Sequence, residues 1–369
     1  NVDGAFRASG AIEENLRRFA QRAAEWVRSV RQAGFHVRYW EIGNEPYGGG
    51  YPLTAEEYAA ALNAFAGAMR REDPAIQIGA AGPGGRSNDA GGVGFADRIG
   101  EDALRRLRER QVSVKDACRQ LTTKRCIDHL RQGRPEENVR TWWEVVTEKA
   151  GNSFDFAVVH RYERVNLRAI AKQERFPISD RLVALRDYLE RRTRRRVPIA
   201  LTEWNTPTEN RRGAISDIEH VLDLAMQIGM NAAGGVEFAH YWPLQTQGTG
   251  NKPFLTKNLE LSPAGELFAI LSQLVPGASA SQSMLDNDVY LFRFRRNGQE
   301  GALLVNNAAS PRQFALDGRG QVTVWRLSER SGGRDAARRV ESCRGLVAQR
   351  GQGYLDLPAR SVTVATWTQ

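Results

Sequence analysis

Hydrophobic residues recur with two different periods along the chain, and the period changes near residue 276. Before that point, segments with helical spacing alternate with short runs of β-branched and aromatic residues. Such runs predict buried strands, and they stand near residues 37, 76, 154, 198 and 235. Strands that alternate with helices usually pair in parallel, so this part predicts an α/β fold with a parallel sheet.

The segments between these runs carry helix start and stop signals. Apolar residues recur at helical spacing over 11–34, and Gly34 is a stop signal. Thr54 with Glu57, and Ser216 with Glu219, have the spacing of capping boxes and predict helices that begin there. The other predicted helices span 137–149, 180–192 and 262–274.

After residue 276 the pattern becomes short alternating runs at 289–294, 302–306, 322–327 and 361–367, separated by turn signals. This pattern predicts an antiparallel β-sandwich. We therefore predict two domains, residues 1–276 and residues 277–369. A polar, charged stretch at about 86–136 predicts an insertion with short helices in the first domain.

The chain has 369 residues, of which 41% are hydrophobic and 26% charged. This composition is typical of a globular protein. No run of roughly 18 apolar residues occurs, so we predict no membrane span. The net charge is +9, and only six of the 52 basic residues are lysines. Basic chains often bind nucleic acid or acidic ligands. Acidic residues are interleaved here, which favours arginines on solvated helix faces, and we predict no nucleic-acid partner.

Two arginine groups differ in their position along the predicted strands. The dense run at 191–196 precedes a strand and so belongs to the amino-terminal end of the sheet. Arg161, Arg211 and Arg212 follow strand ends. In parallel α/β barrels the carboxyl ends of the strands form the active face. Only the second group could therefore contact a substrate. Its positive charge leaves an acidic sugar, such as a uronic acid, as a possible substrate.

Two glutamates stand at the carboxyl ends of predicted strands. Glu45 follows the strand within Trp40–Pro46, and Glu203 lies in the run Leu201–Asn205. Paired carboxylates that face one pocket can hydrolyse a glycosidic bond, one as acid and base and the other as nucleophile. As ordinary loop acids they would have no such role, but two glutamates at two strand ends favour catalysis. Glu41 shares the face of Glu45 about 13 Å lower, at about 3.3 Å per residue, and we predict a buried acid paired with an interior base.

The motif Trp40–Pro46, together with Glu203 on a later strand, resembles clan A of the glycoside hydrolases. The appended sandwich is similar to families 39, 51 and 79 of these retaining enzymes. The resemblance implies a (β/α)8 TIM barrel, of which this chain holds strands four to eight. It implies Glu45 as acid/base and Glu203 as nucleophile, with carboxyl groups about 5–5.5 Å apart. It also implies an O-glycosyl hydrolase that cleaves an oligo- or polysaccharide with retention.

The same resemblance implies further residues that contact the sugar. Asn44 would bind the sugar 2-hydroxyl, and Tyr162 would orient Glu203. His160 shares a face with Tyr162, because side chains alternate along a strand; a core histidine is the alternative. Trp242 would form the floor of the sugar subsite; the alternative is a side chain that fills the barrel interior. The predicted substrate-binding residues are Asn44, Tyr47, His160, Tyr162, Trp204, Tyr241 and Trp242.

Five strands cannot close a barrel, and an open sheet would expose two edges. We expect strands one to three from a second chain of a processed enzyme; the alternative is that the sequence is a fragment of one polypeptide. The rival functions are a noncatalytic carbohydrate-binding protein on a decayed barrel and an anionic-surface binder. The sequence contains no Walker, GxSxG or metal-cluster motif, and we predict no metal and no cofactor.

The three cysteines form no CxxC pair. Cys118 and Cys126 flank a short polar stretch; a local disulfide and two free thiols remain equally compatible with it. A disulfide would fit an exported protein. The chain starts at Asn1 rather than Met. We predict an extracellular or periplasmic location.

Overall fold

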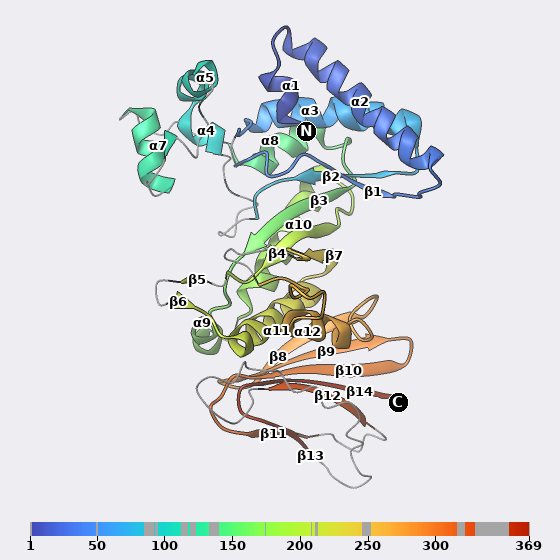
Figure 1. The fold of residues 1–369 in the computed structure, drawn as a ribbon, viewed down its shortest axis with the longest axis vertical. Helices are drawn as coiled ribbons and strands as arrows, with labels where there is room; N and C mark the ends of the chain where they lie inside the picture. Colours follow the sequence, from blue (N-terminus) through green and yellow to red (C-terminus); the bar gives the residue numbers. More distant parts are fainter. Residues whose placement is uncertain are drawn as a thin grey trace. The chain divides into compact units, whose positions relative to one another are not determined.

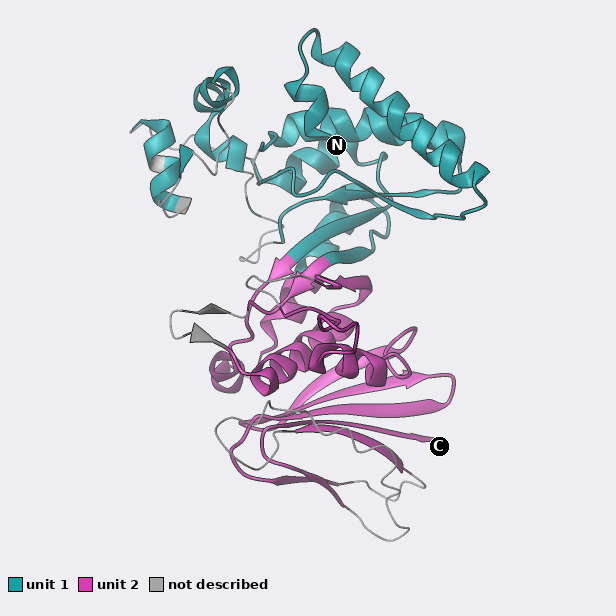
Figure 2. Cartoon of the chain, viewed as in Figure 1, with its two compact units in different colours: residues 1–160, 184–202 teal, residues 161–183, 203–369 magenta. Residues whose placement is uncertain are grey.

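The computed structural model describes most of the chain, in two compact units (Figure 2). Unit 1 comprises residues 1–160 and 184–202, and unit 2 comprises residues 161–183 and 203–369. The described residues are 2–48, 51–84, 92, 95–110, 112, 117–118, 123–132, 140–173, 175–207, 209–210, 213–245, 252–315, 322–328 and 354–368. Among them, no helix combines the length and apolarity needed to cross a membrane.

A five-stranded sheet forms the first part of the fold, in the order β1-β2-β3-β4-β7 (Figure 1). All five predicted strands occur: β1 (Tyr39–Ile42), β2 (Gln77–Ala81), β3 (Phe156–Tyr162), β4 (Ile199–Asn205) and β7 (Val236–Tyr241). The prediction that they are buried is wrong for β1, in which only Ile42 is buried, and for β7, in which no residue is. β2 pairs in parallel with both β1 and β3. The boundary between the units crosses β3 after His160 and β4 after Thr202, so these two strands continue from one unit into the other.

In unit 1, helices α1 (Asp3–Arg7), α2 (Ile12–Gln32), α3 (Ala55–Glu72) and α8 (Trp142–Ala150) pack together. α2 turns Leu16, Ala20 and Val27 inward at helical spacing. α3 begins with the predicted capping box, in which Thr54 accepts from the Glu57 backbone while the Glu57 side chain accepts from the Thr54 backbone. This box satisfies amide groups that the helix itself leaves without partners.

α8 begins later than the predicted segment 137–149, at Trp142 after Thr141. Residues 137–139 lie outside the described part of the chain. The indoles of Trp142 and Trp143 are buried, and they donate to the carbonyls of Ala81 at 3.1 Å and Pro83 at 3.2 Å. α8 is thereby tied to the carboxyl end of β2.

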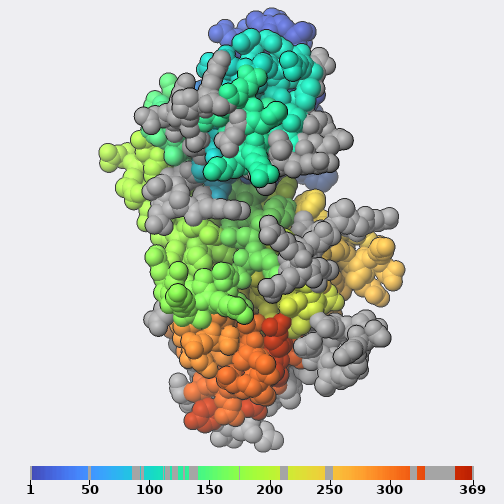
Figure 3. Space-filling model, turned by 90° about the vertical axis from the view of Figure 1, so that its left-hand side faces the viewer, coloured from blue at the N-terminus to red at the C-terminus, as the bar shows by residue number. Residues whose placement is uncertain are grey.

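Within its described residues, the predicted insertion contains α4 (Phe95–Ile99), α5 (Glu101–Glu109) and α7 (Thr123–Arg131), which share a small core. They lie at the surface of unit 1 (Figure 3). Cys118 and Cys126 form a disulfide, which decides between the two alternatives. The Phe95 amide donates to the Tyr47 carbonyl at 2.8 Å. The insertion is therefore anchored to the loop that follows β1.

The arginine run at 191–196 precedes β4, as predicted, and Arg195 has a structural role there. Its guanidinium donates to the carbonyl of Gly151 at 2.8 Å and also to that of Phe154. It lies over the Phe154 ring, 5.1 Å from the centroid. These contacts bind the loop before β3 to the start of β4, so this part of the arginine excess serves the fold.

Unit 2 contains α9 (Leu167–Gln173), α11 (Asp217–Ala233), α12 (Pro263–Leu271) and the hairpin β5 (Glu209–Asn210) with β6 (Gly213–Ala214). α10 (Pro177–Thr193) starts in unit 2 and ends in unit 1. α11 is buried along almost its whole length and contacts the sandwich strands β8, β9 and β10. At Gly229 a Cβ atom would lie 2.3 Å from the Phe292 ring, so only glycine fits this close approach.

The carboxyl-terminal part is the predicted antiparallel sandwich. One sheet has the order β12-β14-β10-β9-β8, and β11 pairs with β13 in a second sheet. Its strands are β8 (Ser279–Asp286), β9 (Val289–Arg296), β10 (Gln299–Asn306), β11 (Arg312–Ala315), β12 (Val322–Ser328), β13 (Tyr354–Leu357) and β14 (Ser361–Thr368). The pattern missed β8, because its serines and glutamine lack the β-branched signal of a strand. It also missed β11 and β13, which have four residues each.

The compact units do not coincide with the predicted boundary after residue 276. Unit 2 joins the sandwich to the later part of the α/β region. The physical reason is the packing of α11 against β8–β10, together with Phe176 stacked edge-on to Phe292 at 5.9 Å. Apolar contacts of this kind do not follow the change in hydrophobic period that marks the sequence boundary.

Candidate active site

Glu45 lies on a constrained turn beyond β1. The chain leaves the strand through Gly43, at φ 83°, and Glu45 itself has φ 45°. This left-handed conformation is uncommon for a residue with a side chain and costs about 1–3 kcal/mol. Backbone bonds from Gly48 to Glu45 at 2.9 Å and from Leu53 to Pro46 at 2.8 Å hold the turn. Surrounding contacts therefore determine where the Glu45 carboxylate points.

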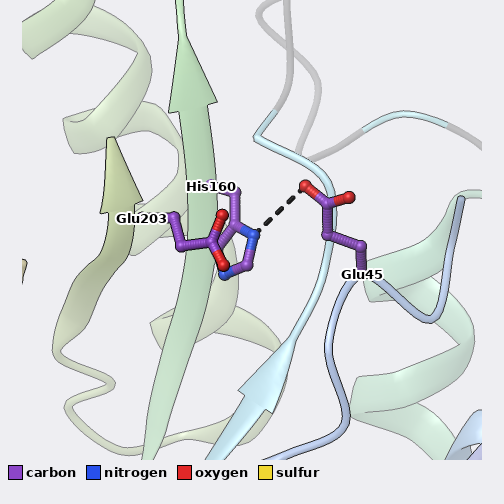
Figure 4. A group of neighbouring side chains, drawn as sticks. All are labelled: Glu45, His160 and Glu203. Atoms are coloured by element: carbon purple, nitrogen blue, oxygen red, sulfur yellow. Dashed lines mark hydrogen bonds and ion pairs between the residues drawn. The ribbon is translucent and has the colours of Figure 1, made fainter. Parts of the chain in front are cut away.

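His160 of β3 connects the Glu45 turn to β4. Its side chain is 4% exposed, and Nδ1 lies 3.2 Å from Glu45 Oε1 (Figure 4). Nε2 lies 3.0 Å from the Thr202 hydroxyl. The hydrogen bond from His160 lowers the pKa of Glu45, outweighing the partial burial that raises it. The carboxyl group of Glu45, with 38% of its side chain exposed, therefore stays ionised to lower pH than usual.

Glu41 approaches the same imidazole from β1. Its Oε1 lies 3.6 Å from His160 Nε2. The predicted pairing of Glu41 with an interior base is therefore confirmed, and the base is His160. The prediction that Glu41 lies well below the Glu45 site is wrong, because Glu41 and Glu45 reach opposite nitrogens of one ring.

Glu203 lies within β4 and has a partner on β3. The Tyr162 hydroxyl donates to Glu203 Oε2 at 2.9 Å, which is the contact expected of an orienting residue. The Trp242 ring meets Tyr162 edge-on, with centroids 6.2 Å apart, and Trp242 is 43% exposed. The ends of β3, β4 and β7 thus present a carboxylate, a phenol and an accessible indole together.

Trp204 does not fit the predicted sugar contact, because it is 1% exposed. It packs edge-on against Tyr241 at 5.8 Å and beside Phe268 at 5.8 Å. Tyr241 is half-buried in the same cluster; burial raises its pKa, and its hydroxyl donates to the Lys252 carbonyl. Both side chains belong to an aromatic cluster next to Glu203 in the chain. A large aromatic at a strand end indicates a sugar contact only if it is exposed.

A buried polar network that the sequence reasoning missed anchors the end of β4. Asn205 is 0% exposed. Its amide donates to the Trp242 carbonyl at 2.8 Å, and its oxygen lies 3.0 Å from His220 Nε2 and accepts from the Thr206 amide at 2.7 Å. Burial lowers the pKa of His220 to about 3, so its ring is neutral and donates to Asn205. The available signal was a set of polar residues spaced three or four apart on an apolar helix: His220, Asp223, Gln227 and Asn231.

Arg161 is engaged in the fold, which removes one argument for an acidic sugar. Its side chain is 9% exposed; it pairs with Glu163 and donates to Asn231 at 3.2 Å. Arg181 also pairs with Glu163. Arg211 and Arg212, the other arginines considered for this role, lie outside the described residues.

The remaining predicted residues stand on the Glu45 loop. Asn44 is exposed, and Tyr47 packs edge-on against Trp142 at 5.9 Å. Glutamate and histidine can bind a divalent cation, and Glu45, His160 and Glu203 are of these types. The predicted absence of a metal at these residues stays a prediction.

Solved structures share this fold. The chain resembles a GH30 endoxylanase from Clostridium papyrosolvens, with TM-score 0.54 and 12% identity over 96% of this chain and 72% of that one. It resembles an α-L-arabinofuranosidase from Thermotoga maritima, with TM-score 0.57 and 16% identity over 98% and 74%. A glucosidase from Croceicoccus marinus gives TM-score 0.54 and 14% identity over 96% and 74%. No family model and no curated protein sequence matches the chain. The likeness establishes the fold that this chain shares with glycosidases.

Proposed function

We propose that this chain is a retaining glycoside hydrolase, with Glu203 as nucleophile and Glu45 as acid/base. The observation that carries the proposal is the pair of carboxylates at two strand ends, each with its own partner. Glu203 accepts from Tyr162, and Glu45 from His160. The fold that the chain shares with glycosidases supports the same assignment by analogy.

The chemistry proceeds by double displacement. Glu45 gives a proton to the glycosidic oxygen while Glu203 attacks the anomeric carbon and forms an ester. Glu45 then removes a proton from water, which hydrolyses the ester with retention of configuration. The Tyr162 hydroxyl orients Glu203 for attack, and Trp242 offers an exposed aromatic face for stacking on a sugar. The substrate is an oligo- or polysaccharide, and a uronic-acid unit remains a proposal without support from Arg161.

The mechanism requires the two carboxyl groups to face one sugar. We expect them about 5–5.5 Å apart, the spacing of retaining enzymes. A crystal structure with a bound sugar analogue measures the separation. A distance of about 8 Å or more in the intact enzyme would indicate inversion instead.

We also propose that further polypeptide completes the sheet beside β1 as barrel strands one to three, supplied by a second chain. Within the described residues β1 stands at one end of the strand order. Phe35 and Val37, which precede β1, are 66% and 43% exposed, which supports this proposal because large exposed apolar side chains often mark an interface. Denaturing gel electrophoresis of an active preparation tests this: a single band at 41.2 kDa would refute it.

An oxidising location agrees with the chemistry of the cysteines. The Cys118–Cys126 disulfide is of a kind that persists outside the cytoplasm. We propose an extracellular or periplasmic site of action. Fractionation of the native host followed by immunoblotting checks it, and a purely cytoplasmic signal would contradict it.

The function is tested with a panel of aryl xyloside, arabinofuranoside, glucuronide, glucoside and galactoside. We expect turnover of at least one, with retention in the first product detected by NMR. Glu203→Gln should lower kcat on the order of 10⁴-fold or more, since nucleophile loss elsewhere costs up to about 10⁶-fold. Glu260→Gln, at an exposed position, is the matched control and should keep wild-type activity. Sugar binding without turnover by the wild type would favour the noncatalytic alternative.

A further inference from the structure

Glu41 is a partly buried acid, with 22% of its side chain exposed, that the double displacement does not use. Among the described residues its Oε1 atom has no hydrogen-bond partner and no contact with solvent. The same oxygen lies 3.6 Å from His160 Nε2. A buried carboxylate oxygen without a partner is costly, so an opposite charge nearby would stabilise it.

His160 can supply that charge. As an imidazolium it donates Nδ1–H to Glu45 and Nε2–H to the Thr202 hydroxyl, and Glu41 is then its counter-ion. As a neutral ring, it loses one of these two donors and leaves Glu41 uncompensated. The ring is 4% exposed, so water screens these interactions little.

A tyrosine stands near Glu41 as well. From α3, the Tyr58 hydroxyl lies close to Glu41; it donates to the Ile42 carbonyl at 2.8 Å and is kept neutral because burial raises its pKa. The carboxylates of Glu41 and Glu45 both contact the ring, which favours its protonated form.

We propose that Glu41 is a positioning residue that sustains the positive charge of His160, so that Glu45 and His160 together hold the proton used on the leaving group. The proposal rests on the function proposed above. It explains how Glu45, ionised in the free protein, serves as a general acid.

The proton balance closes over the two steps. In the first, the His160 Nδ1 proton moves to Glu45 as the Glu45 carboxyl protonates the glycosidic oxygen; the glycosidic bond breaks and the Glu203 ester forms. His160 is then neutral and Glu45 ionised. In the second, Glu45 takes a proton from water, the hydroxide oxygen bonds to the anomeric carbon and the ester bond breaks. The proton returns to His160.

The test is Glu41→Gln, which removes the charge and keeps the shape. The alkaline limb of the kcat/KM profile reports loss of the shared proton. Removing the counter-ion should move this limb down by about one pH unit, since a nearby opposite charge shifts a pKa by about 1–3 units. We expect a roughly tenfold lower kcat/KM above the limb and an unchanged plateau below it. Glu56→Gln, on exposed α3 surface, is the matched control with no shift.

Glu41→Asp keeps the charge and should restore most of the wild-type limb, which a purely packing role would not do. NMR titration of the His160 ring nitrogens, assigned by their loss in His160→Gln, gives a readout that needs no turnover. An unchanged limb and an unchanged His160 titration in Glu41→Gln would overturn the inference and leave the proposed function standing. Failure of the function itself would appear as absent turnover in the wild type, and the titration would still decide the charge of His160.

Discussion

The ends of β4 and β1 hold their glutamates in opposite ways. Glu203 lies within a regular strand whose end is anchored by buried Asn205 and His220. Glu45 lies three residues beyond its strand, at φ 45°, with 38% of its side chain exposed. A nucleophile must attack along one line, which suits a rigid strand. An acid/base acts on the leaving group and then on water, which suits a carboxylate on a turn, tuned by a neighbouring base.

The largest effect that tests this contrast is Glu45→Ala. General acid catalysis contributes about 10²- to 10⁴-fold, so hydrolysis of natural linkages should fall by that factor. Aryl glycosides with an activated leaving group need no acid, and azide should restore turnover by replacing the base. Steady-state kinetics with a natural linkage and with an activated aryl glycoside measure the loss of activity for each leaving group. Equal loss with both groups would make Glu45 a structural residue, and Glu56→Ala is the control.

A smaller effect is expected at the β4 end from Tyr162→Phe. The variant removes one hydrogen bond to a charged group, worth about 1.5–3 kcal/mol. We expect kcat to fall about tenfold or more with little change in KM, since in the proposed mechanism the bond orients Glu203 rather than binding the sugar. Tyr290→Phe removes a hydroxyl that donates to the Leu167 carbonyl in the same unit, and should leave kcat unchanged. A change confined to KM would contradict the orienting role.

The anchored end of β4 also predicts a pH dependence of stability. Burial lowers the pKa of His220 from 6.5 to about 3, so between these values the unfolded chain binds a proton that the folded chain does not. The contribution of His220 to the free energy of unfolding is therefore full above pH 6.5. It falls with acidification by up to about 1.4 kcal/mol per pH unit. Urea unfolding at several pH values measures this slope. In His220→Gln the slope should decrease, and an unaltered slope would exclude His220 as its source.

The smallest effect compares backbone strain at the two glutamates. At position 45 the left-handed conformation disfavours any Cβ, so Glu45→Gly should be more stable than Glu45→Ala by about 1 kcal/mol. At position 203 the order should reverse, with Glu203→Gly less stable than Glu203→Ala by about 0.5–1 kcal/mol, because glycine weakens a strand. Chemical denaturation of the four variants checks the sign. If the glycine variant were the more stable one at both positions, or at neither, the two glutamates would not differ in backbone strain.

Strand-end positions were predictable because the relevant signals are local. The hydrophobic run before Gly43 and the run before Trp204 each mark a strand, and the glutamate beside each strand end is read directly from the sequence. The alternation along β3 predicted that His160 and Tyr162 share a face. The contacts of both residues with strand-end glutamates agree with it.

Other features depended on residues far apart in the chain. Trp204 looks like a sugar platform in sequence, but Phe268 and Tyr241 cover it. Arg161 looks free to bind an acid, but Glu163 and Asn231 engage it. Burial and pairing of this kind arise from side chains that the fold brings together, and a local pattern does not encode which of them meet.

The sequence by itself therefore determined the five strands of the α/β region, most helices around them, four of the sandwich strands and the two glutamates at strand ends, because period and turn chemistry act over a few residues. The tertiary structure alone decided that Glu41 and Glu45 reach one imidazole, that Asn205 and His220 anchor β4, and that Cys118 bonds Cys126. These outcomes depend on distances of a few ångströms between distant positions. Such distances are set by packing of the whole chain.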